Sequence, residues 1–538
     1  MKKIGYMLTS ILVLVFSFVL INRLQEKNFT VFNDVAADQM ETIKSQLPET
    51  DEFAFTALLC NEIRVPFDEA TNTFFVPLDM ETADWETLKF TSGQGEYRIL
   101  FESDITDEDK QKVIADGRRV ELLVYTDQFW SEYYVTFTGL PIIDLATNEG
   151  FYAAENITGT AVFYDTDFSL HGTEWSEYNG HIRGNTSRMF PKKGYKINLR
   201  KTNGDGVTEL NKMSLFGMRK DDDWILHALY NDDTKIRDML SMQVWDTFGA
   251  KAVSETSYYG PKMTYVEVFA DNVYCGLYGL MEPVDAKQLD LSLEDYSYKK
   301  SNPGGLKYMY SSFHDMKDPN LEIEGFRIKE GPIDDEEYDI WEPLATLAEM
   351  VTLPGPEFEE EESMIINDES ALRLWLFIQL ISGHDHTAKN VFYIAKYNDD
   401  LPKNYQFYFA PWDMDLTWGN VSVGDINPVY TAFEAETVDD RIDWVVGDEI
   451  LDIDRNDSQA YVQKLYEELR ATVLTEEQLE EMILQLDHQV RASGAFGRDR
   501  ERWPKSVHAE NYEQLLNYAT KRLEFLDKAL YDIEYYDT

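Results

Sequence analysis

The chain has 538 residues, of which 43% are hydrophobic and 14% aromatic, so it can build packed cores and is too long for a single one. Its 49 Lys and Arg residues against 99 Asp and Glu residues give a formal net charge of -50, which repels phosphate backbones and excludes nucleic-acid binding as the main function. The two cysteines, Cys60 and Cys275, exclude a disulfide framework and a cysteine-based zinc site, and they fall in different predicted domains.

The N-terminus predicts export. Two lysines precede an apolar run at residues 4–21, which approaches the length of a bilayer crossing and has positive charge on its N-terminal side. The run ends without the small-residue pair that signal peptidase favours, so we expect an uncleaved signal anchor over residues 1–24 and a cell-membrane protein with its bulk outside the cytoplasm. The alternative is a cleaved signal peptide and a secreted protein. Residues 25–50 are polar and predict a stalk.

The next hundred residues predict a small β-sandwich-like domain. Short runs rich in β-branched and aromatic residues alternate there with polar turns, at residues 74–78, 97–101, 120–125 and 133–137. No catalytic constellation occurs among them, so a spacer or binding role is expected.

A strand expected at residues 195–199 brings the first candidate ligands. Its apolar residues alternate with polar ones, and the turn before it, residues 183–188, is rich in Gly, Asn and Ser. Such a turn can offer backbone N–H groups to a phosphate, and Lys192 or Lys193 at the strand entrance can reach the same oxygens. Alone this is weak evidence, because most Lys-Lys pairs ahead of a strand are merely solvated.

A helix and a hairpin follow. Asn231 or Asp232 can cap the helix, and capping explains both residues without a functional role. The hairpin is expected at residues 264–269 and 274–280, and Glu282 comes directly after it. One apolar face defines the helix, formed by Ile236, Met239, Leu240, Val244 and Phe248.

The segment from 291 to 370 looks like a variable insertion. It is rich in Gly, Lys and acidic residues, and one helix is expected near residues 341–351. The acidic run Glu359–Glu362 is most simply a solvated face.

The most informative residues lie in the following segment, where an apolar helix at 371–381 leads to Asp385 and Asn390. Two strands, at residues 391–395 and 405–409, are joined by a strong turn signal, so the hairpin brings Asp413 back beside Asp385 and Asn390. A base and metal-binding groups in this order are typical of phosphoryl-transfer enzymes.

His384 and His386 flank Asp385 and suggest a mixed-ligand metal site. No third histidine stands at ligand spacing, so a packing or hydrogen-bonding role is the better interpretation.

Several motifs follow one another along the chain. They are Arg183-Gly184-Asn185-Thr186-Ser187 with Phe190-Pro191-Lys192-Lys193, Asp223-Trp224 through Asn231-Asp232 to Arg237, Gly276-Leu277-Tyr278 with Glu282, Asp385 to Asn390 with Pro411-Trp412-Asp413-Met414-Asp415, Arg502-Trp503-Pro504, and Arg522. In this order they resemble the CotH kinase family, the spore-coat-protein-H group of atypical protein kinases. The resemblance covers roughly residues 155–532 and leaves the N-terminal β-rich domain outside it.

The resemblance implies an α+β fold, a divergent two-lobed protein-kinase-like domain, that transfers the γ-phosphoryl group of ATP to Ser or Thr of a protein substrate with Mg²⁺ or Mn²⁺. Asp385 would be the base, and Asn390 and Asp413 would hold the metal, with Asp415 a weaker candidate ligand. The substrate would be basic or rich in serine. The remaining nucleotide-binding candidates are Lys193 on the ATP phosphates with Lys192 and Lys196 as rivals, Arg183 and Ser187 of the turn, and Glu282 near the adenine.

The chain departs from ordinary protein kinases in lacking a Gly-x-Gly-x-x-Gly loop, a His-Arg-Asp triplet and an Asp-Phe-Gly motif. The helix after the lysine strand offers Asp232, Asp233 and Asp238 rather than a clear glutamate, so the carboxylate that pairs with the lysine stays open.

Two other functions are alternatives to the kinase function. A pseudokinase or surface adhesion protein would keep the fold for binding, although intact Lys193, Asp385, Asn390 and Asp413 argue against lost catalysis. A metal-dependent glycosyltransferase would use Asp413-Met414-Asp415 as an Asp-x-Asp motif, but that short motif is common by chance.

The C-terminal part predicts helices that buttress the catalytic region. Thr475-Glu476-Glu477-Gln478 forms a capping box, and a last helix is expected over residues 511–531. The elements divide the chain into an anchor (1–24), a stalk (25–50), a β-rich module (51–150) and a kinase-like domain (155–538), the last made of an N-lobe-like part (155–290), an insertion (291–370), the catalytic and metal motifs (371–425) and a helical part (426–538).

Overall fold

The computed structural model of the chain leaves the expected membrane anchor at residues 4–21 and the acidic run at 359–362 outside its described residues. Within the described part, no helix combines the length and the hydrophobicity that a membrane crossing needs. The described residues are 36–52, 54–82, 85–102, 109–167, 173–248, 260–301, 322–323, 325–332, 339–353, 355, 357–358, 365–387, 389–423, 430–433 and 435–530.

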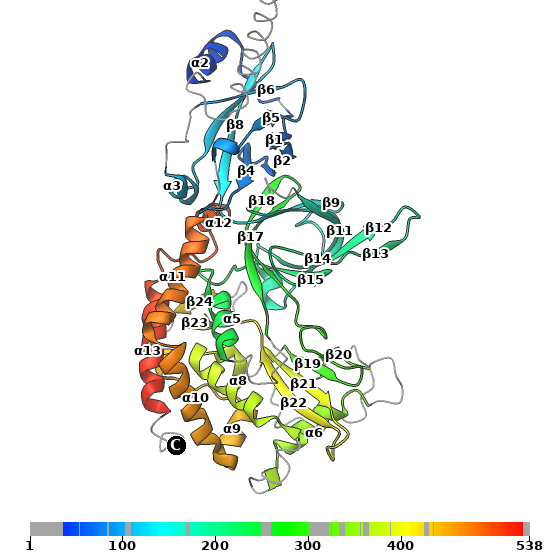
Figure 1. Ribbon diagram of the computed structural model, residues 1–538, viewed down its shortest axis with the longest axis vertical. Helices are drawn as coiled ribbons and strands as arrows, with labels where there is room; N and C mark the ends of the chain where they lie inside the picture. The colour runs from blue at the N-terminus through cyan, green and yellow to red at the C-terminus, as the bar shows by residue number, and fades with distance from the viewer. Residues whose placement is uncertain are drawn as a thin grey trace, which may run out of the picture.

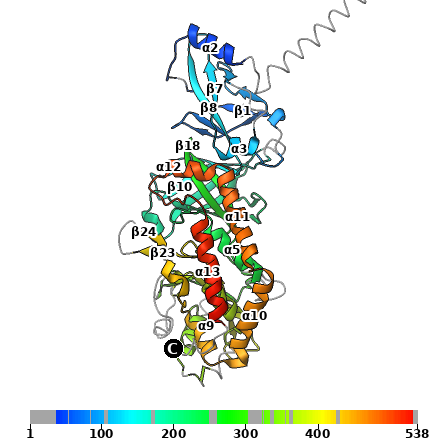
Figure 2. The same ribbon diagram turned by 90° about the vertical axis from the view of Figure 1, so that its left-hand side faces the viewer.

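Three bodies follow one another along the long axis of the molecule (Figure 1). An N-terminal β-rich domain occupies one end, a β-barrel lies in the middle, and a small sheet with most of the helices forms the other end. Figure 2 shows that the C-terminal helices run along one side of the molecule and reach from the far end up to the N-terminal domain. The C-terminal segment therefore contacts all three bodies.

The N-terminal domain packs two sheets around one apolar core. The core continues onto the outside of the barrel through Ile142, Tyr164, Phe269 and Tyr274, so the two bodies share buried surface. The elements are α2 (Ala36–Gln46), the sheet β2 (Ile63–Arg64), β1 (Leu58–Cys60) and β5 (Phe90–Ser92), the sheet β3 (Phe67–Asp68), β4 (Thr73–Pro77), β8 (Trp130–Thr138), β7 (Val120–Tyr125) and β6 (Arg98–Phe101), and α3 (Lys110–Ala115).

The middle body is a closed seven-stranded barrel. All neighbouring strands are antiparallel except β17 and β9, whose parallel pairing, together with the pairing of β11 and β12, closes the ring. Each of the seven strands therefore pairs with a neighbour on both sides. In order around the ring the strands are β9 (Ile142–Thr147), β10 (Asn156–Tyr164), β11 (Glu174–Arg183), β12 (Gly194–Thr202), β16 (Asp223–His227), β18 (Val273–Met281) and β17 (Met263–Ala270).

Successive side chains of a strand point alternately into and out of the barrel, so every second side chain fills its interior. On β12, Tyr195, Ile197 and Leu199 are buried, which confirms the predicted phase of this strand. The loop between β9 and β10 covers one end, where Phe151 stacks on Tyr195 at 4.2 Å between ring centroids. The functional residues therefore lie at the rim and not inside the barrel. A short strand, β13 (Thr208–Leu210), pairs with the end of β12, and β14 (Met213–Ser214) and β15 (Lys220–Asp221) form a separate two-stranded sheet.

The third body contains a four-stranded antiparallel sheet in the order β20, β19, β21, β22. The predicted hairpin is confirmed by β21 (Val391–Tyr397) and β22 (Tyr405–Pro411). The other two strands, β19 (Tyr296–Lys300) and β20 (Phe326–Glu330), come from the segment expected to be an insertion with a single helix. That expectation was wrong for these residues, because β19 pairs directly with β21 and is an inner strand of the sheet.

Helices pack against the four-stranded sheet in the third body (Figure 1). The predicted capping of α11 is confirmed, since the Thr475 side chain accepts a hydrogen bond from the Gln478 N–H at 3.2 Å. The remaining elements are α5 (Arg237–Phe248), α6 (Glu342–Met350), α8 (Asp368–Ile381), β23 (Asn420–Val423), β24 (Tyr430–Phe433), α9 (Val445–Asp452), α10 (Ser458–Thr472), α11 (Glu476–Ala492), α12 (Ala495–Arg502) and α13 (Glu513–Ala529).

The expected mixture of helices and strands is confirmed, while the seven-stranded barrel was not predicted. Strand β9 belongs to the barrel, although the sequence placed its residues within the β-rich module. Barrel closure depends on which strand pairs with which, and periodicity within a strand carries no information on its partners.

Candidate functional site

The candidate site is a cavity of ≈230 Å³ between the rim of the barrel and the third body. Five segments line it, namely the turn after β11, the loop after β16, Ser301 directly after β19, and the loops before and after the β21–β22 hairpin. The lining side chains are Arg183, Asn185, Thr186, Ser187, Phe190, His227, Ala228, Leu229, Tyr230, Asn231, Ser301, Asp385, Lys389, Asn390, Asp413, Asp415 and Leu416, with the backbone of Gly184 and Gly194.

A second hollow, of ≈400 Å³, lies on the wall of the barrel and is more open. It is lined mainly by Thr and Asn side chains with Glu177 and Arg200. None of the predicted site residues lies there, so the smaller cavity is the candidate active site.

The end of helix α8 places Asp385. Asn367 caps the start of this helix, and Ser382 ends it in the left-handed conformation with φ 52°. The short helix η6 (His384–Thr387) follows at once and carries Asp385 to the cavity. The Lys389 Nζ lies 2.9 Å from Asp385 Oδ2.

The hairpin brings Asn390 and Asp413 together, as the sequence predicted. Val391 pairs with Pro411 at the base of the hairpin, and the Trp412 N–H donates to the Asn390 carbonyl at 2.9 Å. The Asn390 side chain donates to the Asp413 carbonyl at 3.4 Å. Both residues have positive φ, 61° for Asn390 and 57° for Asp413, a conformation that Asn and Asp tolerate better than most residues.

Asp413 is kept ionised by the cations around it. Burial alone would raise the pKa of its carboxyl group, but Lys299 and Arg183, followed by His227 and Lys389, hold that pKa below its usual range. A buried carboxylate that stays charged is a suitable ligand for a divalent cation.

Asp415 has the opposite environment. Burial, together with the neighbouring Asp413 and Asp238, raises the pKa of the Asp415 carboxyl group well above its usual value. The His227 Nε2 lies 2.9 Å from Asp238 Oδ2, and the pKa of His227 is raised by Asp238 in spite of burial. Asp413, Asp415 and His227 therefore line the same cavity, and Asp238 contacts His227 from outside the lining.

A metal would need additional ligands at this site. Among the residues that the structure describes, no three Asp, Glu, His or Cys side chains converge closely enough to form a complete metal site. Mg²⁺ is commonly held by one or two carboxylates with substrate phosphates and water. The pair Asn390 and Asp413 fits that requirement, and Asp415 lines the same cavity.

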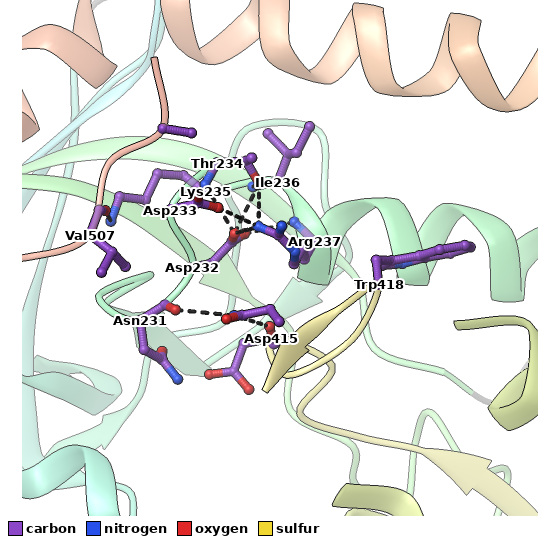
Figure 3. Close-up of polar contacts among 12 residues, drawn as sticks. Asn231, Asp232, Asp233, Thr234, Lys235, Ile236, Arg237, Asp415, Trp418 and Val507 are labelled. Carbon is purple, nitrogen blue, oxygen red and sulfur yellow. Dashed lines mark hydrogen bonds and ion pairs between the residues drawn. The ribbon is translucent and has the colours of Figure 1, made fainter. Parts of the chain in front are cut away.

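The loop after β16 is fixed by a buried ion network (Figure 3). Arg237, which is fully buried, contacts Asp232 Oδ1 at 2.5 Å and Asp233 Oδ1 at 2.6 Å through its Nη1. Asp232 also accepts the backbone N–H of Arg237 at 2.8 Å, so it fixes the start of α5 as the predicted capping role implies. Asp232 and Asp233 therefore pair with Arg237 and hold the loop in place.

The network positions Asn231 on the cavity wall. The Asn420 side chain donates to the carbonyl of Asn231 at 3.1 Å and to that of Asp415 at 2.9 Å, which ties the two segments together. Figure 3 shows Asn231 and Asp415 side by side below the ion network.

Lys192, a predicted nucleotide ligand, lies outside the cavity. Its Nζ is 2.6 Å from Asp499 Oδ1 and donates to the Leu277 carbonyl at 2.5 Å. Both charged side chains are completely buried. Asp499 on α12 is therefore the carboxylate that pairs with Lys192, in place of the candidates Asp232, Asp233 and Asp238.

Three other predicted nucleotide ligands also make contacts outside the cavity. The Lys193 Nζ donates to the Arg188 carbonyl at 2.5 Å, and the Lys196 Nζ lies 3.1 Å from Asp223 Oδ2. Glu282 accepts the backbone N–H of Arg219 at 3.0 Å. None of these three side chains lines the cavity, whereas Arg183 and Ser187 do.

Lys299 on β19 is a cation that the sequence analysis missed. Its Nζ lies 4.6 Å from the centre of the Trp412 ring, and Arg183 lies 5.4 Å from the same ring on the barrel side. Burial and the nearby Arg183 lower the pKa of Lys299 to about 7. The sequence did contain a strand signal in this segment, because Phe326 and Ile328 of β20, the strand that pairs with β19, alternate with charged residues.

Lys389 is the second missed cation, although it stands directly before Asn390. Among the described lining residues, only Arg183 and Lys389 carry a permanent positive charge. Lys389 could have been found from its place inside the Asp385 to Asn390 motif.

The flanking histidines and the cysteines take ordinary roles. His386 is buried, and burial lowers its pKa, while His384 lies 3.6 Å from Asp440 Oδ2. Cys60 and Cys275 are both free and buried, and burial raises the pKa of each thiol to about 12.

Comparison with known proteins gives one result. A family model described as CotH kinase protein matches residues 181–526. A search of curated proteins finds no match to the chain. The matched region begins in β11, ends in α13 and includes every residue that lines the cavity. Because the match spans more than half of the 538 residues, the chain belongs to the CotH kinase protein family.

Proposed function

We propose that the chain is an ATP-dependent protein kinase that transfers the γ-phosphoryl group to Ser or Thr of a protein substrate. The observation that carries the proposal is the convergence of Asp385, Asn390 and Asp413 with the cations Arg183 and Lys389 around one cavity. Phosphoryl transfer asks a protein mainly for positioning and charge neutralisation. This set supplies a base, oxygen ligands for a metal and positive charge within a single enclosure.

The nucleotide would lie across the boundary between the barrel and the third body, and in this proposal these two bodies would act as the two lobes of a kinase. Arg183 from the barrel and Lys299 from the sheet face the same Trp412 ring, so a triphosphate on these cations would contact both bodies. In this proposal Arg183, which lines the cavity, takes the phosphate-binding role that the sequence analysis gave to Lys193, and Lys299 adds positive charge beside Trp412 and Asp413. The backbone of the turn at residues 184–187 lines the cavity and can donate to the same oxygens.

The residues that would hold a divalent metal are Asn390 and Asp413, with Asp415 as a further candidate. When bound, Mg²⁺ or Mn²⁺ would neutralise charge on the phosphates. Asp413 is suited to this role because its neighbours keep it ionised in spite of its burial.

Asp385 would act on the acceptor. Its carboxylate lies at the cavity and is partly exposed, with 27% of its side chain accessible, so an incoming hydroxyl group can reach it. It would orient that hydroxyl and accept its proton. The acceptor oxygen would bond to the γ-phosphorus as the bond between that phosphorus and its bridging oxygen breaks, and the electron pair of the broken bond would leave with ADP.

The substrate and the location are part of the proposal. A net charge of -50 attracts basic protein segments, which favours a basic or serine-rich acceptor. Membrane attachment would come from residues 4–21, with the catalytic part outside the cytoplasm.

The test uses ATP labelled at two positions. The full chain is incubated with Mg²⁺ and a basic serine-rich protein, and with ATP labelled on either the γ or the α phosphorus. A kinase transfers label from the γ position only, to Ser or Thr. Transfer of α label would instead indicate nucleotidyl transfer, and no transfer of either label with Mg²⁺ or Mn²⁺ would contradict the proposal.

A further inference from the structure

The hollow of ≈400 Å³ on the wall of the barrel has no part in the proposed kinase site. Its volume falls within the range of small-molecule binding sites. Neighbouring barrel strands from β9 to β12, together with the short strand β13, form its walls. The polar side chains on which the following argument depends are Thr158, Thr160, Glu177, Asn179 and Arg200.

The strand register brings these side chains together. Across β10 and β11, Thr160 lies opposite Glu177 and Thr158 lies opposite Asn179. Glu177 in turn lies opposite Arg200 of β12. Directly opposite residues of an antiparallel pair project from the same face of the sheet. The five side chains therefore share the face that is hollowed.

Arg200 is the cation of this hollow. In the part of the chain that the structure describes, it forms no ion pair with Glu177, and its Nε, which is shielded from solvent, has no hydrogen-bond partner. Glu177 instead accepts a hydrogen bond from Thr202 Oγ1 at 2.6 Å. A shielded donor without a partner destabilises the folded chain. A guanidinium held in this state at a hollow indicates a ligand that accepts its hydrogen bond.

An exposed tryptophan adjoins the polar residues. Trp175 precedes Glu177 by two positions on β11, so its ring projects from the same face of the sheet. Its side chain is 63% exposed, although a buried indole ring would remove a large apolar area from water. Leu210 of β13, which is 49% exposed, lies opposite Arg200. The face thus combines an apolar platform with a polar hollow.

This combination selects for a ligand that carries hydroxyl groups. Arginine only donates hydrogen bonds and a carboxylate only accepts them, so the neighbours Arg200 and Glu177 match a group that does both. A pyranose ring carries hydroxyls along its edge and has an apolar C–H face that packs on an indole ring. Glu177 and the net charge of -50 disfavour a polyanion, and a lipid chain would leave the polar lining unpaired.

We propose that this hollow is a carbohydrate-binding site for a neutral oligosaccharide of pyranose sugars. Trp175 packs on one sugar ring, and Arg200, Glu177 and Asn179 bind hydroxyl groups of the same chain of sugars. The proposal goes beyond the kinase function and does not rest on it. Glu177 and Arg183 are six positions apart on β11, which is about 20 Å, so a bound glycan surface would lie close to the kinase cavity.

Isothermal titration calorimetry of the full chain tests the proposal with four neutral hexasaccharides, made of β-linked N-acetylglucosamine, β-linked glucose, α-linked glucose or β-linked xylose. At least one should bind the wild-type chain. For that sugar, Trp175→Ala and Arg200→Met should each raise the Kd about tenfold or more, and Trp175→Phe should recover part of the affinity. Phe129→Ala is the matched control, because it removes an exposed aromatic ring of the N-terminal domain, and it should bind as wild type does.

Two results would overturn the proposal. One is that none of the four sugars binds the wild-type chain, and the other is that Trp175→Ala and Arg200→Met bind the sugar as tightly as wild type. If no sugar binds but a basic serine-rich protein binds wild type and loses affinity for Trp175→Ala, the hollow is a protein-docking surface instead. Because the calorimetry uses no ATP, its result is independent of the kinase proposal.

Discussion

Lys192 and Asp499 form a completely buried ion pair, with 2.6 Å between Nζ and Oδ1, although 307 positions separate them in the chain. Asp499 also accepts the backbone N–H of Leu277 at 3.0 Å and contacts His508 Nε2 at 3.1 Å. Burial would raise the pKa of Asp499, but Lys192 and His508 hold it far below its usual range. The pair attaches helix α12 to the barrel and so connects the C-terminal segment to the body that carries Arg183.

Replacing Lys192 with Met should destabilise the protein and spare the nucleotide site. The change leaves Asp499 as a buried charge without its main partner, which costs about 3–5 kcal/mol of unfolding free energy. Chemical denaturation measures the loss, and Lys201→Met on the exposed end of β12, the strand that follows Lys192, serves as the control. If the Lys192→Met protein had normal stability but had lost ATP binding, Lys192 would be a nucleotide ligand and not a structural residue.

Gly276 provides a second test of the same junction. Its φ is 110°, and a Cβ there would lie 2.4 Å from Asp499 Oδ1 and 3.0 Å from Trp503 Nε1. We expect Gly276→Ala to lower the unfolding free energy by about 1–3 kcal/mol or more. Gly204→Ala is the matched control, since a Cβ at Gly204 meets nothing within 4 Å. Equal stability of the two variants would show that α12 does not press on this strand.

The sequence predicted what depends on neighbouring residues. The capped start of α11, the β21–β22 hairpin and the return of Asp413 to Asn390 all follow from turn chemistry and local periodicity. The contact of Lys192 with Asp499 could not be predicted, because nothing local links a strand entrance to a helix three hundred positions later.

The lysine assignment shows where local patterns mislead. A lysine before a strand is as compatible with a buried structural pair as with a phosphate, and the structure gives Lys192 the first role. Lys299 was missed because its strand was taken for part of an insertion. The pattern Phe326-Arg327-Ile328-Lys329, apolar alternating with charged, was a strand signal within that segment.

ATP affinity should depend on pH through Lys299. Because its pKa is lowered to about 7, this lysine loses its positive charge as the pH rises from 6 to 8.5. If it binds phosphate, the Kd for ATP increases over that range. Lys299→Arg should remove the lysine contribution to the increase, because arginine stays charged, and it also controls for protonation of ATP itself. Identical pH profiles for wild type and Lys299→Arg would argue that Lys299 does not contact the nucleotide.

Asp413→Asn should separate metal binding from phosphate binding. Loss of the carboxylate weakens the site for a divalent cation, so the Mg²⁺ concentration needed for half-maximal ATP binding should rise about tenfold or more. In EDTA, ATP should bind the variant at least as tightly as wild type, since Arg183 and Lys299 lose a neighbouring negative charge. Titrations of ATP with and without Mg²⁺ give both quantities. If the Mg²⁺ concentration needed for half-maximal ATP binding did not change, the metal would not be bound by Asp413.

The most direct test of the central claim, that Asp385, Asn390 and Asp413 form one phosphoryl-transfer site, is the rate of γ-label transfer by wild type, Asp385→Asn, Asn390→Ala, Asp413→Asn and the control Lys403→Met on the exposed turn of the β21–β22 hairpin. Each substitution at the site should lower the rate about a hundredfold or more, while the control keeps the wild-type rate. Transfer that continues at the wild-type rate in Asp385→Asn and Asp413→Asn would contradict the account.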